Sequence, residues 1–81
     1  MRWQRADDGR YAVWLSGDYM IVRWATYDRG NRVMQYQATV SGEPLHAEPL
    51  RSLEAAKRTC SDHRHRMQIR RQVQRRADRE G

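Results

Sequence analysis

The sequence predicts an α+β fold in which a three-stranded antiparallel β-meander packs on one long C-terminal α-helix, in the order β-β-β-α. Three observations support this prediction: apolar residues alternate in three successive segments, turn-forming residues separate these segments, and residues 53–80 contain neither Gly nor Pro. A chain of 81 residues has enough apolar surface for one core but not for two. We therefore expect a single domain over residues 1–81, with sheet and connector at about residues 3–50 and a helix at residues 52–79.

The predicted strands occupy residues 11–15, 19–27 and 33–40, where side-chain character alternates with the period of a half-buried strand. Residues 16–18 (Ser-Gly-Asp) and 28–31 (Asp-Arg-Gly-Asn) separate them and are typical of tight turns. All three Trp and all four Tyr lie in the first 36 residues. Aromatic side chains can therefore form much of the core in a chain that lacks Phe and is poor in Leu and Ile.

One face of the second and third strands is expected to cover the helix. The residues assigned to it are Met20, Val22, Trp24, Met34, Tyr36, Ala38 and Val40. The opposite, exposed face would then carry Arg23, Tyr27, Gln35, Gln37 and Thr39, with Arg29 and Arg32 at the second hairpin. Arg and Gln on an open sheet can read base edges in a DNA major groove. The alternative is a polar face that is merely solvated.

Residues 41–50 are interpreted as a connector, because Pro44 and Pro49 disfavour both a central strand and a helix interior. Leu45 and Leu50 are expected to anchor this connector to the core. Ser52 is a good N-cap for the helix that follows, and an acidic residue in the first turn favours the same start.

The helix has two apolar lines on roughly opposite sides. Leu53, Ala56, Cys60 and Met67 form the line expected to cover the sheet. The other line consists of Ile69, Val73 and Ala77. We therefore expect the last three turns to overhang the domain and to offer a seam to a partner, the alternative being a frayed tail.

Charge is concentrated in the C-terminal part of the chain. Residues 1–50 hold six Arg and six acidic residues, whereas residues 51–81 hold nine Arg and one Lys against four acids, so 10 − 4 gives the whole formal charge of +6. This balance favours a polyanionic partner, with nucleic acid or an acidic protein surface ahead of a membrane. The preference for Arg over Lys favours forked recognition of phosphate or carboxylate, or else reflects a GC-rich genome.

Part of this charge forms a basic stripe, which consists of Lys57, Arg64, Arg71 and Arg75. At 100° per residue these four lie within about 40° of one another and extend over roughly 27 Å, with Arg79 close by. Such a stripe can follow a phosphate backbone. The alternative is a helix face that is charged only because it is solvated.

Catalysis and metal binding are not expected. Cys60 and His63 are one helical turn apart, but His65 faces elsewhere and only the distant His46 could complete four zinc ligands. As a nucleophile and base, Cys60 and His63 lack an orienting third group. No Gly-rich phosphate loop or paired carboxylates are present. We expect no enzyme, cofactor, metal or small-molecule substrate. The short apolar runs predict no membrane span, and we expect a soluble, cytoplasmic protein of a bacterial host cell.

The sequence resembles small accessory proteins of bacteriophages and prophages over roughly residues 3–63. The shared elements are an early Trp (Trp3), a Tyr-x-Ile strand (Tyr19, Ile21), a Tyr-x-Ala strand (Tyr36, Ala38) and a helix opening with Ser-Leu-Glu-x-Ala-Lys at residues 52–57. Most such proteins have no known function, but proteins of this size and origin include inhibitors of host defence such as anti-CRISPR proteins. A more remote similarity is to Apetala-type and integrase arm-type DNA-binding domains, which read the major groove with the sheet. This chain departs from them, because its basic charge lies on the helix.

These observations predict a non-enzymatic, phage-type binding protein. Its basic helix would engage nucleic acid or a nucleic-acid-bearing host complex and so inhibit a host defence effector. The alternatives are a DNA module that reads sequence with its exposed sheet face and a structural or oligomerisation protein. We expect a monomer, because Arg66 and Arg70 beside the apolar seam would oppose their copies in a symmetric pair.

Overall fold

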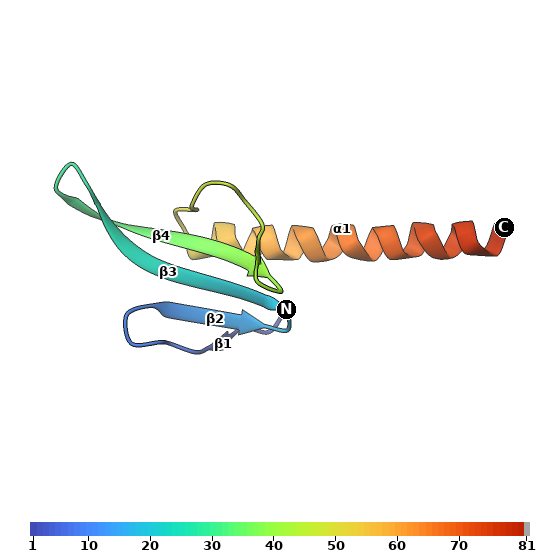
Figure 1. Cartoon of the computed structure of the whole chain (residues 1–81), viewed down its shortest axis with the longest axis horizontal. Helices are drawn as coiled ribbons and strands as arrows, with labels where there is room; N and C mark the ends of the chain where they lie inside the picture. The colour runs from blue at the N-terminus through green and yellow to red at the C-terminus, as the bar shows by residue number, and fades with distance from the viewer. Residues whose placement is uncertain (81) are drawn as a thin grey trace.

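The protein is a five-stranded antiparallel sheet with one long helix, and its computed structural model describes the backbone of residues 1–80 and the side chains of residues 1–77. The strands follow one another across the sheet in chain order, and the helix extends well past the sheet (Figure 1). The elements are β1 (Gln4–Arg5), β2 (Ala12–Ser16), β3 (Tyr19–Asp28), β4 (Asn31–Val40), β5 (Glu43–Pro44) and α1 (Leu53–Glu80).

The α+β class, the antiparallel meander and the C-terminal helix are confirmed, but the sheet has five strands and not three. Glu43 and Pro44, predicted to lie in a connector, form a short edge strand. A two-residue turn causes this difference: Ser41 and Gly42 have φ angles of 50° and 83°, which return the chain onto β4 so that Val40 pairs with Glu43. A Pro is tolerated here because the strand is at the sheet edge.

The predicted face of β3 is wrong. The turn at Arg29 and Gly30, with φ angles of 52° and 82°, pairs Asp28 with Asn31. From this pairing the register places Ile21 opposite Ala38. Cross-strand partners share a face of the sheet, so the even-numbered apolar residues of β4 lie with the odd-numbered residues of β3. Met20, Val22 and Trp24 therefore lie on the face away from the helix, together with Gln35, Gln37 and Thr39.

The core lies between the first two turns of α1 and the face of the sheet that carries the odd-numbered residues of β3 and the even-numbered residues of β4. Ile21 and Ala38 from the sheet, and Ala56 and Cys60 from the helix, are all completely buried. Trp14 and Tyr36 enlarge this core, with their ring centroids 6.2 Å apart. The small residues Ala38 and Ala56 allow the helix to approach the sheet closely, and the aromatic rings fill the space beside them.

The connector after β5 closes the outer edge of β4. Leu45 N donates to Ala38 O at 2.9 Å, and Leu50 exchanges two backbone hydrogen bonds of 2.8 Å with Tyr36. Between these contacts, His46 Nε2 accepts a hydrogen bond from Ala38 N at 2.9 Å. The predicted anchoring by Leu45 and Leu50 is confirmed, since both pack against the core.

Helix α1 begins where the sequence indicates. The Ser52 hydroxyl accepts a hydrogen bond from Ala55 N at 3.1 Å, as expected of an N-cap. Leu53 is half-buried, but Met67, predicted to cover the sheet, is 37% exposed because the helix has already passed the sheet. All side chains of residues 64–77 are exposed, and we call this segment the overhang. It helps to give the molecule an elongated shape of 60 × 25 × 18 Å (Figure 1).

Candidate nucleic-acid interface

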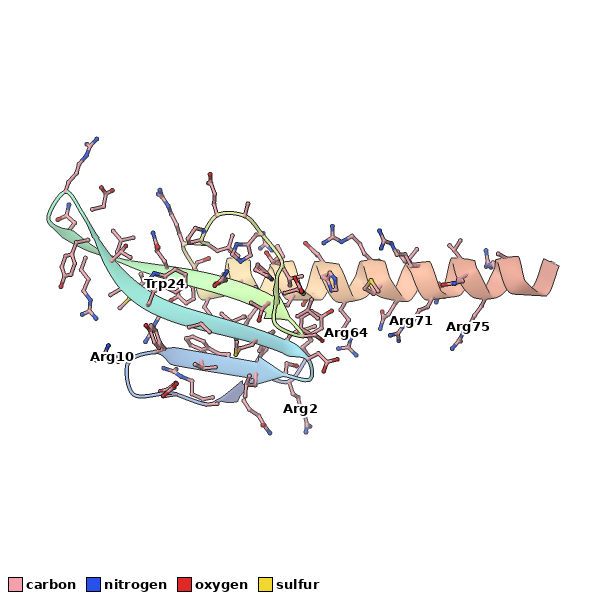
Figure 2. The ribbon with its side chains drawn as sticks, viewed as in Figure 1. Arg2, Arg10, Trp24, Arg64, Arg71 and Arg75 are labelled. Atoms are coloured by element: carbon pink, nitrogen blue, oxygen red, sulfur yellow. The ribbon has the colours of Figure 1, made fainter. Side chains whose placement is uncertain are left out.

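The basic stripe is present on one side of α1. Lys57, which lies in the part of the helix that packs on the sheet, is half-buried, whereas Arg64, Arg71 and Arg75 are exposed. Figure 2 shows these three arginines pointing to the same side of the helix, the side on which β1 and β2 lie. Arg79 lies outside the described side chains. The structure thus brings the predicted stripe together, and most of it belongs to the overhang.

The overhang carries charge that nothing in the described part of the chain neutralises. Residues 63–77 contain six Arg and no acidic residue. Among the side chains of residues 1–77, the one ion pair joins Arg5 Nε to Asp7 Oδ1, at the edge of the sheet formed by β1. The hydrogen bond from Arg5 is the main cause that lowers the pKa of Asp7. Uncompensated charges of one sign repel one another along a helix, and a polyanion bound there would remove that repulsion.

A shallow groove lies where the helix leaves the sheet. It has a volume of about 530 Å³, and its walls include the turn between β2 and β3, Met1, Met67 and the stripe residues Arg64 and Arg71. The lining is mixed: apolar side chains such as Met67 and Val40 lie beside polar and charged ones, which include Asp18 and Gln68 as well as the two arginines. Sequence reasoning missed this groove, because its walls are far apart in the chain.

Tyr19 and His63 connect the sheet to the helix beside this groove. The Tyr19 hydroxyl and His63 Nδ1 are 2.8 Å apart in a hydrogen bond, and the two rings meet edge to face at a centroid distance of 5.7 Å. Burial is the largest cause of the raised pKa of Tyr19, which therefore stays neutral at physiological pH. This contact comes at the last partly buried turn of α1, so it sets the direction in which the overhang leaves the domain.

The predicted sheet-face set does not come together. Arg23 lies on the helix-facing side opposite Tyr36, with its guanidinium carbon 5.6 Å from the centroid of the Trp14 ring. Gln35 and Gln37 lie on the other face, where both are half-buried. Arg29 and Arg32 are exposed at the end of the β3–β4 hairpin. The prediction that Arg23, Gln35 and Gln37 lie on the same face of the sheet was wrong. The turn at residues 29–30 pairs odd-numbered residues of β3 with even-numbered residues of β4, so Arg23 lies on the opposite face from the two glutamines.

The predicted apolar seam is exposed. Ile69 is 45% exposed, Val73 is 61% exposed, and Ala77 is also on the surface. None of the described residues of the sheet or connector covers this line, so it is available to a partner. Its neighbours around the helix include Arg66 and Arg70, which are exposed as well.

The residues considered for catalysis have structural roles. Cys60 is fully buried, and this burial raises the pKa of its thiol to about 11. A thiol with that pKa is a poor nucleophile at neutral pH. His46 uses both ring nitrogens, since Nδ1 also contacts Glu48 O. Across the described residues, no group of three or more His, Cys, Asp or Glu side chains is arranged to hold a metal ion.

Within the described part of the chain, α1 is too polar to cross a lipid bilayer. No family model, curated protein or solved structure matches the chain. The function is therefore inferred from the geometry and charge of the residues themselves.

Proposed function

We propose that this protein is a non-enzymatic binding protein that engages nucleic acid through the basic side of helix α1. One observation carries the proposal: the segment of residues 63–77 holds six Arg and no acid, and none of these arginines has an ion-pair partner among the described side chains. An isolated solvated helix is normally stabilised by alternating charges that pair one turn apart. Among the side chains of residues 1–77 the overhang has no such pair, so its composition favours binding of an external anion over stability of the helix itself.

The spacing of the charges favours a repeated anion over a single one. Arg64, Arg71 and Arg75 extend in a line along a straight helix, and with Lys57 the line is about 27 Å long. A nucleic acid presents phosphates at regular intervals over such a length, and guanidinium groups bind phosphate with two parallel hydrogen bonds. The natural target in this proposal is nucleic acid or a nucleic-acid-bearing complex of a bacterial host.

The resemblance to phage accessory proteins supports a more specific role as an inhibitor of a host defence effector. In this proposal the protein occupies a nucleic-acid path or a surface beside it, and it needs no chemistry of its own. Cys60 and His63 serve packing and hydrogen bonding. Inhibition should therefore depend on the arginines of α1 and not on a reactive thiol.

The test is the binding of a fluorescently labelled duplex DNA, followed by anisotropy between 50 and 200 mM salt. If only the basic stripe binds, four phosphates are neutralised and the log-log salt slope is roughly −3.6. The triple variant Arg64→Gln, Arg71→Gln and Arg75→Gln should weaken binding strongly. Because all three side chains are exposed, the variant should keep the thermal stability of the parent protein.

A matched control separates a site from net charge. The triple variant Arg10→Gln, Arg29→Gln and Arg32→Gln removes the same charge from exposed positions in the sheet hairpins. It should bind duplex DNA almost as well as the parent protein. Equal weakening by the two triple variants, or no salt-dependent binding at all, would contradict the proposed function.

A further inference from the structure

The groove beside Tyr19 lies on the side of α1 that faces the core. Leu53 and Cys60 pack into the core, and Met67 follows them on the same line of the helix. Burial of the helix ends before Met67, which is 37% exposed and lines the groove. Val40 lines the groove from β4. The groove therefore offers apolar side chains to a ligand at the point where the core stops.

The charged residues of the groove come from two separate parts of the chain. Arg64 and Arg71 belong to α1, and Asp18 belongs to the turn between β2 and β3. Among the side chains of residues 1–77, none of these three forms an ion pair. Burial is the largest influence on the pKa of Tyr19, but the charges of Arg64 and Asp18 also act on it, in opposite directions. Charges of both signs are thus close enough to the groove to act on one bound molecule.

The position of Asp18 is set by two turns of the sheet. Residues 17 and 18 form the two-residue loop between β2 and β3, in which Ser16 pairs with Tyr19. The carbonyl oxygen of Asp18 accepts a hydrogen bond of 2.8 Å from Ser41 N, in the turn that follows β4. An ionised carboxylate only accepts hydrogen bonds. The turn between β2 and β3 therefore presents an acceptor to the groove from a fixed backbone.

A ligand for this groove needs donors for the carboxylate, an anion for the two arginines and an apolar surface between them. An unpaired guanosine nucleotide has all three. The Watson–Crick edge of guanine carries two neighbouring N–H donors, which match the two oxygens of a carboxylate, whereas thymine has one donor between two acceptors. Guanidinium groups bind its phosphate with paired hydrogen bonds. In a duplex this edge of guanine is already paired, so only an unpaired base can offer it.

We propose that the groove binds an unpaired guanine of a single-stranded nucleic acid, with Asp18 on the Watson–Crick edge of the base and Arg64 and Arg71 on the neighbouring phosphates. This inference rests on the proposed nucleic-acid function and specifies the nucleotide bound at one end of the basic stripe. Met67 contacts the flat face of the base. From Arg71 the strand continues along the overhang toward Arg75, which lies on the same side of the helix.

The experiment measures the anisotropy of labelled short oligothymidines that differ only at the central nucleotide, which carries thymine, guanine, hypoxanthine or no base. All four have the same number of phosphates, so any difference in affinity comes from the base. The guanine oligonucleotide should bind at least roughly tenfold more tightly than the thymine one. Hypoxanthine lacks the exocyclic amino group of guanine and should lose most of this preference. Equal binding of the thymine and guanine oligonucleotides would overturn the guanine site.

The variant Asp18→Asn separates hydrogen bonding from charge. If Asp18 acts only by repelling phosphates, its replacement tightens the binding of every oligonucleotide equally and the preference for guanine is kept. The guanine site instead predicts that this preference is lost. The matched control Asp28→Asn removes the same charge from an exposed position at the end of β3 and should keep the preference. Thermal unfolding checks that both variants are folded.

The double variant Arg64→Gln and Arg71→Gln tests the proposed function with the same oligonucleotides. It should weaken the binding of all four and reduce the magnitude of the log-log salt slope by roughly 1.4, since single strands give roughly 0.7 for each phosphate. Such weakening without any preference among the bases overturns the guanine site and leaves the proposed function standing. Absence of binding to every oligonucleotide also overturns the guanine site, and absence of binding to duplex DNA as well overturns both.

Discussion

The two isoleucines of this chain offer a direct test of how packing is divided between sheet and helix. Ile21 is completely buried in the sheet, whereas Ile69 is 45% exposed on the overhang. Substitution by Val removes the same methylene at both positions. At Ile21 the loss of buried surface costs about 0.8 kcal/mol, and the cavity that remains brings the expected loss of stability to about 1 kcal/mol.

This difference is measurable by thermal unfolding, since about 1 kcal/mol lowers the Tm of a domain of this size by roughly 4–8 °C. Ile21→Val should show this decrease, and Ile69→Val should change the Tm by less than about 2 °C. An unchanged Tm for Ile21→Val would refute the assignment of the core face of β3. An equal decrease in Tm for Ile69→Val would show that the overhang packs against another surface. If the Tm also depended on protein concentration on dilution, that surface would belong to a second copy of the chain.

Three further predictions concern Cys60, His46 and the seam. Burial raises the pKa of the Cys60 thiol to about 11, so the unfolded chain loses this proton at lower pH than the folded protein does. The stability of the protein should therefore be unaffected by this thiol well below pH 9 and should fall as the pH rises toward 11. Chemical denaturation across this range should show a smaller decrease for Cys60→Ala than for the parent protein. His46→Leu should cost about 1–3 kcal/mol in urea unfolding, because the N–H of buried Ala38 loses its acceptor, and a cost under about 0.5 kcal/mol would contradict that role. Sedimentation near physiological salt should show a monomer; a stable dimer that Ile69→Asp with Val73→Asp converts to folded monomer would favour the structural alternative instead.

The sequence was sufficient to predict the elements that have strong local signals. Ser52 and the absence of Gly and Pro afterwards located the helix, and alternating residues with turn signals located β2, β3 and β4. The two added strands could not be recognised in this way, because each has only two residues and no periodicity can be read from so short a segment. They form because tight turns bring them beside a longer strand.

The face of β3 was ambiguous for a different reason. Both of its faces carry large apolar side chains, with Tyr19 and Ile21 on one and Met20, Val22 and Trp24 on the other, so hydrophobic alternation alone cannot choose between them. The turn provides the missing information. A two-residue loop at positions 29–30 requires the numbers of paired residues to sum to 59, which places odd residues of β3 on the face of the even residues of β4.

The candidate site was predicted only in part because helical periodicity gives directions around an axis but not what surrounds that axis. It placed Arg64, Arg71 and Arg75 on one side correctly. It could not show that burial of the helix ends before Met67, so that Arg66 and Arg70 on the other side are exposed as well. The groove beside Tyr19 is formed by four separate parts of the chain, which are Met1, residues 16–19, Val40 and residues 63–71, and only the folded chain brings them together.

The core and the overhang occupy separate parts of the chain, so the overhang can change in sequence without changing the core. Every completely buried side chain lies at or before Cys60 among the described residues, so substitutions in the overhang leave the core intact. The overhang can therefore carry six like charges without burying any of them in the core, because those charges lie beyond the buried turns of the helix. Charge of this density placed over the sheet would need ion-pair partners or would weaken packing. The length of helix beyond the sheet is thus the feature that allows a domain with so small a core to present a strongly cationic surface.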